Sequence, residues 1–110
     1  MPSRFEPCGL NQLYSMRYGT PPIVRSGGGL ADSVVDFDAR SRSGTGFVFS
    51  AYDAHTLAHT IRRAFSVYGG DELTLHGLIR RAMRADFGWA QSARAYLHVY
   101  KQAMADSVAP

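Results

Sequence analysis

Residues 22–30 read Pro22-Ile23-Val24-Arg25-Ser26-Gly27-Gly28-Gly29-Leu30, a short apolar run that ends in a glycine turn. The apolar part is typical of a buried strand. A second strand, Gly46-Phe47-Val48-Phe49, is predicted after a polar, glycine-containing loop over residues 38–45. Between the strands, residues 30–35 predict a short helical turn, although residues 34–37 are equally compatible with a strand. This alternation indicates an α/β fold rather than an all-α fold.

Helices are predicted on both sides of the strand pair. The first covers residues 9–18, with Leu10, Leu13 and Tyr14 on one face. Three amphipathic helices follow the second strand, and Asp53 is the predicted N-cap of the first of these. Their apolar stripes are Ala54, Leu57, Ala58, Ile61, Ala64, Phe65 and Tyr68; then Leu75, Leu78, Ile79, Ala82 and Met83; then Trp89, Ala93, Tyr96, Leu97, Tyr100 and Met104. The tail from residue 106 to 110 is predicted to fray.

This order of elements is typical of the second half of a domain built on a parallel sheet. The chain has 110 residues, of which 45% are hydrophobic and 19% charged, and this balance fits one small globular domain. A net charge of +3 is by itself compatible with nucleic-acid binding. The one cluster of arginines, Arg80, Arg81 and Arg84, is better explained as a solvated helix face, so no nucleic-acid partner is expected.

The single cysteine excludes an internal disulfide and fits a reducing cytosol. The N-terminus shows no basic stretch followed by an apolar run, and no apolar stretch is long enough to span a bilayer. We therefore expect a cytoplasmic protein without a membrane partner, or a plastid protein if the source is a plant.

Glu6 is the first candidate functional residue, because it lies in a loop immediately before a predicted helix. Ligands of open α/β sheets bind at loops that follow strands, and a helix N-terminus offers amides to phosphate or sugar oxygens. Gly9 lets this backbone approach a ligand closely, and a carboxylate beside it can hold sugar hydroxyls. Spacing alone leaves the interpretation of Glu6 as an ordinary surface acid equally open.

The glycine turn and the cysteine each admit a functional and a plainer interpretation. Ser26-Gly27-Gly28-Gly29 could form an anion-binding nest, but a tight turn explains it better. Cys8 has no histidine near it in the sequence to act as a base, so a packed or ligand-lining thiol is favoured over a nucleophile.

Two helical patterns are also weighed against structural roles. His55 and His59 have the spacing of metal ligands, but no third ligand accompanies them, so no metal site is predicted. Trp89, Tyr96 and Tyr100 lie at helical spacing, for which core packing is the simpler interpretation.

Taken in order, these segments resemble the C-terminal region of bacterial glycogen synthases and plant starch synthases. The donor-site motif of that family is similar to Pro2-Ser3-Arg4-Phe5-Glu6-Pro7-Cys8-Gly9-Leu10-Asn11-Gln12-Leu13-Tyr14. The resemblance continues through residues 18–25, 28–36 and 44–49 and into the last predicted helix. It covers essentially the whole chain and implies part of a Rossmann-like C-terminal domain of the GT-B fold.

The resemblance implies transfer of glucose from ADP-glucose to the non-reducing end of an α-1,4-glucan, with retention and without a metal or other cofactor. Glu6 is then the catalytic carboxylate that binds the donor glucose hydroxyls. The backbone at Cys8, Gly9 and Leu10 is expected to contact sugar and phosphates. The remaining residues that the resemblance assigns to donor binding are Asn11, Gln12, Tyr14, Gly28 and Gly29.

Two positions depart from related patterns. Tyr14 stands where other retaining glycosyltransferases carry a second glutamate, which favours the glycogen and starch synthase branch. Gly27 stands where the family usually has threonine or serine.

The resemblance also predicts that residues 1–110 are only part of a C-terminal domain. The N-terminal domain and the cationic groups that neutralise the donor diphosphate are expected outside this chain, which is therefore expected to be inactive alone. The alternative is a non-catalytic module that keeps affinity for ADP or glucan.

Overall fold

Two short parallel strands form the centre of the fold. They are β1 (Ile23–Arg25) and β2 (Phe47–Phe49), and Val24 lies opposite Val48 in their register. The computed structural model describes residues 1–107. Both predicted strands are confirmed, and their parallel pairing requires the crossover that the intervening helix provides.

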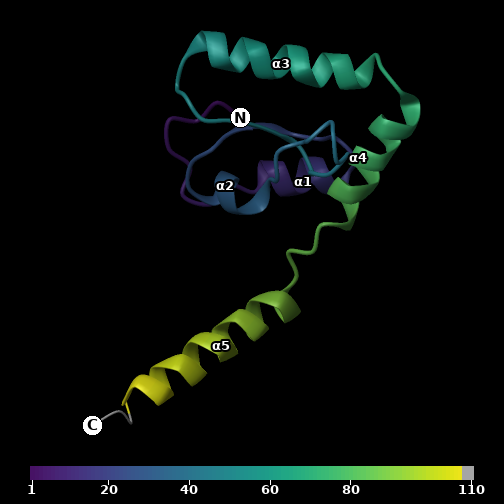
Figure 1. Cartoon of the computed structure of the whole chain (residues 1–110). Coiled ribbons are helices and arrows are strands. Elements are labelled where there is room, and N and C mark those ends of the chain that lie inside the picture. Colours follow the sequence, from purple (N-terminus) through teal and green to yellow (C-terminus); the bar gives the residue numbers. More distant parts are fainter. Residues whose placement is uncertain (108–110) are drawn as a thin grey trace.

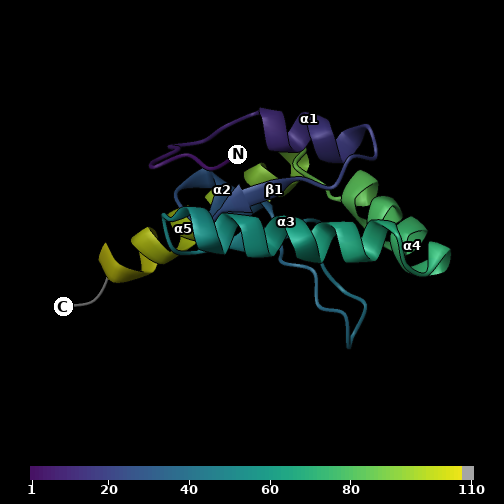
Figure 2. The same ribbon diagram turned by 90° about the horizontal axis from the view of Figure 1, so that it is seen from above.

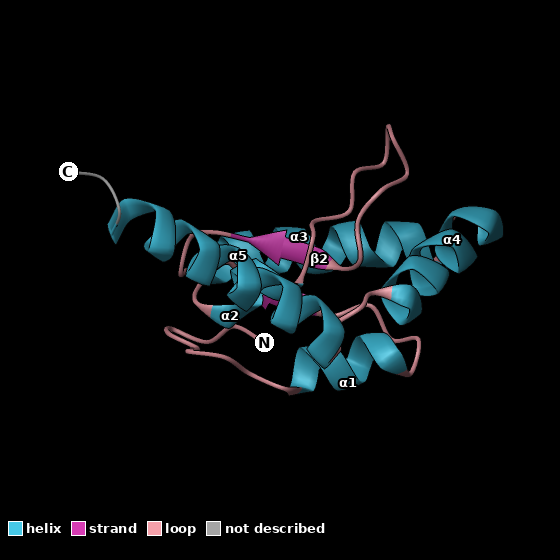
Figure 3. Cartoon of the chain, turned by 90° about the horizontal axis from the view of Figure 1, so that it is seen from below, coloured by secondary structure: helices cyan, strands magenta, loops and turns pink. Residues whose placement is uncertain are grey.

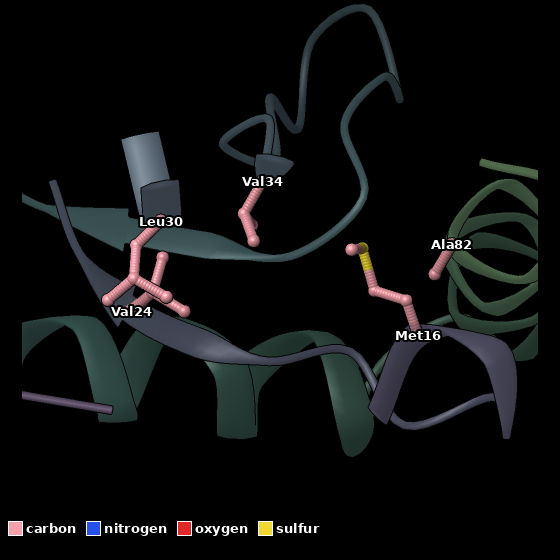
Figure 4. Close-up of a cluster of buried hydrophobic side chains, with 5 residues drawn as sticks. All are labelled: Met16, Val24, Leu30, Val34 and Ala82. Atoms are coloured by element: carbon pink, nitrogen blue, oxygen red, sulfur yellow. The ribbon is translucent and has the colours of Figure 1, made fainter. Parts of the chain in front are cut away.

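Helices cover both faces of this small sheet. α3 (Ala54–Tyr68) lies on one face, whereas α1 (Asn11–Arg17) and α2 (Gly29–Ser33) lie on the opposite side (Figure 1). A buried cluster joins β1, α1 and α2 to α4 (Glu72–Arg84). Its members are Met16, Val24, Leu30, Val34 and Ala82 (Figure 4). The predicted α/β class is confirmed.

The predicted apolar face of α1 is wrong in part. Gln12 and Met16 are the buried residues, whereas Leu13 is half-buried and both Leu10 and Tyr14 are exposed. Residues four apart share one side of a helix, so α1 presents a polar side chain and a methionine to the interior. Burial of the Gln12 side chain is compensated by hydrogen bonds to the loop that precedes α1. The apolar periodicity of a helix does not reveal such contacts.

Of the two alternatives between the strands, the helical turn is the one that forms. α2 ends at Ser33, and the segment after it carries two isolated bridges, a parallel one between Asp36 and Gly46 and an antiparallel one between Asp38 and Ser43. Asp36 Oδ1 accepts a hydrogen bond from the Val48 amide at 2.7 Å, and its carboxylate pairs with Arg63 at 3.0 Å. This carboxylate thus occupies the outer edge of β2, and the following loop projects from the body (Figures 2 and 3).

Each of the two middle helices begins at an aspartate. Asp53 accepts a hydrogen bond from the Thr56 amide at 2.8 Å and caps α3 as predicted. Asp71 accepts one from the Thr74 amide at 3.1 Å and caps α4 (Glu72–Arg84). Both carboxylates satisfy amides that have no partner inside their helices.

We expect acid to destabilise this pair of helices through the two caps. Hydrogen bonds from Thr56 and Thr74 hold the pKa values of Asp53 and Asp71 below their ordinary value of 3.8. Their stabilisation is therefore complete above that pH and is lost as the pH falls through the lower pKa values of the folded state. Urea unfolding followed by circular dichroism should show a midpoint that drops over this range. An unchanged acid dependence in a double Asp53→Asn, Asp71→Asn variant would contradict the assignment.

The predicted apolar stripe of α4 is confirmed at its centre, whereas the centre of the predicted α3 stripe is only half-buried and the buried residue of α3 is Thr60, which lies outside that stripe. Leu78 of α4 is fully buried, and it packs with Phe37 and Phe47 in a second cluster. On α3, however, Phe65 and Tyr68 are exposed. They border an open apolar hollow of about 210 Å³ between α3, the sheet and α4.

α5 (Trp89–Ser107) projects away from the other elements (Figure 1). The prediction that its aromatic residues pack in the core is wrong. Trp89 is 88% exposed, and Tyr96 and Tyr100 are about 60% exposed. α5 continues through Ser107, so the predicted fraying is wrong at residues 106 and 107. The rest of the predicted tail, residues 108–110, lies outside the described residues. Within residues 1–107, no helix is long and apolar enough to cross a membrane.

Candidate functional site

The candidate site is the loop over residues 2–10, which we call the Glu6 loop. It lies at the carboxyl end of β1, where ligands of parallel sheets bind. Two attachments show this placement. The guanidinium of Arg25, the last residue of β1, donates to the Arg4 carbonyl at 2.8 Å. The turn after β1 donates the Gly29 amide to the Glu6 carbonyl at 3.1 Å.

The glycine turn packs directly on the backbone of the Glu6 loop. A Cβ atom at Gly28 would lie 2.0 Å from the Glu6 carbonyl oxygen, and one at Gly29 would lie 2.3 Å from the Cys8 carbonyl oxygen. Gly28 also has a φ of 52°, which L side chains rarely adopt. The turn is thus a close backbone contact. The Gly29 amide is already bonded to the loop, which favours the tight turn over an anion nest.

Gln12 secures the other end of the loop. Its side chain is 1% exposed. The two N–H bonds of Nε2 are shared among three acceptors, the Cys8 carbonyl at 3.1 Å, the Gly9 carbonyl at 2.9 Å and Ser33 Oγ at 3.2 Å. Gly9 has a φ of 68°, and a Cβ there would lie 2.8 Å from Gln12 Oε1. Glycine is therefore required where the loop turns into α1.

Arg25 is a site residue that sequence reasoning missed. Besides Arg4, its guanidinium donates to the Ser50 carbonyl at 3.1 Å and lies 5.5 Å from the ring centroid of Tyr52. It therefore ties the Glu6 loop to the segment after β2. The available signal was a charged residue at the end of an otherwise apolar strand.

The Glu6 carboxylate is half-buried and has little to hold it internally. Ser3 Oγ donates to its Oε2 at 3.5 Å, a long contact, and it makes no ion pair within residues 1–107. The Gly9 and Leu10 amides likewise donate no hydrogen bond to the described part of the chain. A carboxylate acceptor and two free N–H donors thus lie on one short loop, a combination suited to hydroxyl and phosphate groups.

Of the other predicted donor-binding side chains, Cys8 and Asn11 lie on or next to the Glu6 loop, whereas Tyr14 does not. Asn11 is exposed at the start of α1, next to the loop, and Cys8 is an exposed free thiol. Tyr14 lies two residues after Gln12 and hence on the opposite side of α1. It lines a separate hollow of about 330 Å³ with Arg17.

The remaining candidates are not brought to the loop. His55 and His59 are both exposed on α3, and among residues 1–107 no three His, Cys, Asp or Glu side chains gather as metal ligands. The three arginines of α4 do not share one solvated face. Arg81 is half-buried and donates to the Gly44 carbonyl at 3.0 Å, whereas Arg80 and Arg84 are exposed.

The chain is similar in sequence to known glycogen synthases. A glycogen synthase of Desulforudis audaxviator is 56% identical over 104 residues, which are 94% of this chain and 21% of that protein. A glycogen synthase of Halorhodospira halophila is 53% identical over 105 residues, 96% of this chain and 22% of that protein. The chain thus spans about a fifth of the length of these relatives.

Solved structures show the same fold. The catalytic domain of starch synthase IV from Arabidopsis thaliana, bound to ADP and acarbose, superposes with a TM-score of 0.79 at 40% identity, over 94% of this chain and 22% of that one. A sucrose-phosphate synthase from Thermosynechococcus elongatus gives a TM-score of 0.61 at 30% identity, over 96% of this chain and 25% of that one. The predicted resemblance and GT-B fold class are confirmed.

The family match covers the elements that build the site. Residues 1–73 match the family described as glycosyl transferases group 1. This range contains the Glu6 loop, α1, both strands, the glycine turn and α3. The chain therefore belongs to the glycosyl transferases group 1 family.

Proposed function

We propose that this chain is part of the C-terminal domain of a retaining glucosyltransferase of the glycogen and starch synthase type. The observation that carries the proposal is the Glu6 loop, where a carboxylate and two free amides meet at the carboxyl end of β1. The donor is ADP-glucose, and the acceptor is the non-reducing end of an α-1,4-glucan. A relative that was solved with ADP and acarbose supports both assignments.

In this proposal the two halves of the loop act on different parts of the donor. The Gly9 and Leu10 amides donate to the diphosphate and sugar oxygens, where positively polarised N–H groups suit negative charge. Glu6 accepts hydrogen bonds from the glucose hydroxyls and stabilises positive charge that develops on the sugar as the bond to the diphosphate breaks. No metal takes part. Asn11, Cys8, Tyr14, Gly28 and Gly29 remain predicted contributors to donor binding.

An N-terminal domain is the partner that completes the site in this proposal. It supplies the cationic groups that neutralise the leaving diphosphate, without which the chain alone is inactive. The exposed aromatic face of α5, with Trp89, Tyr96 and Tyr100, is the surface that such a domain covers. The exposed free thiol of Cys8 supports a reducing, cytoplasmic setting.

Titration calorimetry with two ligands tests the proposal. We expect saturable binding of both ADP and ADP-glucose to the chain. Because Glu6 contacts only the sugar, Glu6→Ala should weaken ADP-glucose binding about tenfold, as expected for lost hydrogen bonds to a charged group, and leave ADP binding unchanged. Absence of ADP binding, or binding that merely decays with salt, would exclude a donor site on this loop.

A further inference from the structure

We propose that Gln12 is a positioning residue, whose buried amide orients the two N–H groups that the Glu6 loop offers to the donor diphosphate. The inference deepens the proposed function and rests on it. It assigns to Gln12 a role behind the loop rather than a contact with the ligand.

The Gln12 amide points at the backbone of the Glu6 loop. Its Nε2 carries two N–H bonds and lies within 3.1 Å of two consecutive backbone carbonyls, those of Cys8 and Gly9. The side chain is 1% exposed, so water cannot replace these contacts. Both carbonyls are therefore drawn inward, towards α1.

The planarity of the peptide bond couples these carbonyls to the amides of the following residues. In a trans peptide the C=O and the next residue's N–H point in opposite directions, and no peptide bond within residues 1–107 is cis. The Cys8 carbonyl shares its plane with the Gly9 amide, and the Gly9 carbonyl shares its plane with the Leu10 amide. Pulling both carbonyls inward therefore turns both N–H groups outward, away from α1. Neither of these amides has a hydrogen-bond partner in the described chain.

Gln12 is itself held by Ser33. Ser33 Oγ lies 3.2 Å from Gln12 Nε2 and donates in turn to the Gly29 carbonyl in α2. The Gly29 amide donates to the Glu6 carbonyl, so the same small network reaches the loop at Glu6 as well as at Cys8 and Gly9. Glu6 and the two outward amides are thereby held in one fixed arrangement.

The unpartnered oxygen of Gln12 argues against simple filling of the interior. Oε1 is buried and accepts no hydrogen bond within residues 1–107. Burial of such a group costs about 1–3 kcal/mol, which a methionine of similar length would not incur. A glutamine at this position is explained by what its N–H groups do for the loop.

Gln12→Met tests the proposal in the full 110-residue chain, because it keeps the length and removes both donors. We expect ADP affinity to fall about tenfold or more, since two hydrogen bonds to the loop are lost. The order parameters of the Gly9 and Leu10 amides should fall from about 0.85 to below about 0.6. Thr60→Val is the matched control, because Thr60 is equally buried and polar but bonds only within α3. It should cost stability without affecting either readout.

Gln12→Glu adds a readout that a purely structural role would not produce. The ionised carboxylate would face two carbonyl oxygens, so burial and repulsion raise its pKa, and only the protonated form can donate. The ratio of its ADP affinity to that of the unmodified chain should therefore rise as the pH falls from about 7 towards 5, a comparison that cancels the titration of ADP itself.

The outcomes separate the two proposals. If the unmodified chain does not bind ADP but Gln12→Met loosens the loop amides, the donor site is wrong and the positioning of the loop stands. If the chain binds ADP, and Gln12→Met neither weakens it nor lowers the order of these amides relative to Thr60→Val, the positioning role is overturned.

Discussion

Gly28→Ala is expected to displace the Glu6 loop and to lower the free energy of unfolding by about 3 kcal/mol. The new Cβ would lie 2.0 Å from the Glu6 carbonyl oxygen and 2.9 Å from its carbonyl carbon. Those atoms belong to the backbone, so no side-chain rotation relieves the clash. The φ of 52° and ψ of −140° at Gly28 add strain for any L residue. Urea unfolding measures the loss, and calorimetry should show weaker ADP binding.

Gly27→Ala is the matched control for this substitution. A Cβ there meets only the end of the Arg25 side chain at 3.5 Å, an ordinary van der Waals contact. Alanine also restricts the unfolded chain more than glycine, so stability should be unchanged or slightly higher. Equal destabilisation by both substitutions would show that the loop does not pack on the turn as described.

Glu6→Gln has the largest expected effect on activity. In the chain joined to its N-terminal partner domain, glucose transfer to glycogen should fall about 100- to 1,000-fold, the range for removing one preorganised electrostatic group. Glutamine keeps the shape and the acceptor oxygen but removes the negative charge that stabilises the developing cation. Stability should hardly change, since the one internal partner of this carboxylate is a 3.5 Å contact with Ser3.

Glu72→Gln provides the control for charge alone. Glu72 is exposed in the first turn of α4 and faces only His76 at 3.8 Å. Its replacement changes the net charge by the same amount at a distance from the loop, so transfer should be retained. A similar loss of transfer in both variants, or none in Glu6→Gln, would remove Glu6 from the catalytic role.

The elements themselves could be predicted because their signals are local. Short apolar runs marked β1 and β2, and Asp53 marked the start of α3. The failures lie where burial depends on a neighbour. Phe65 continues the stripe of α3 yet stays exposed, because no element covers that edge within residues 1–107.

The site was predicted in part, because only some of its features depend on residues that are neighbours in the sequence. Its motif placed Glu6, Gly9 and Leu10 on one loop, and continuity of the chain guaranteed that they stay close. Gln12 and Arg25 act through the loop backbone, and Arg25 does so across 21 residues of sequence. Such contacts have no periodicity, so Gln12 was taken for a ligand contact and Arg25 was missed.

The sequence by itself determined the family, the order of strands and helices, and the loop that carries Glu6, because glycines, caps and apolar runs act over a few residues. The tertiary structure decided which side of α1 is buried and why Gly28 and Gly29 must lack side chains. It also decided which carbonyls Gln12 and Arg25 hold. These depend on backbone segments that meet only when the turn after β1 closes onto the Glu6 loop. Because the turn and the loop are closely packed, no Cβ fits between them. Water cannot reach the carbonyls there, so each of them needs a hydrogen-bond donor from the protein.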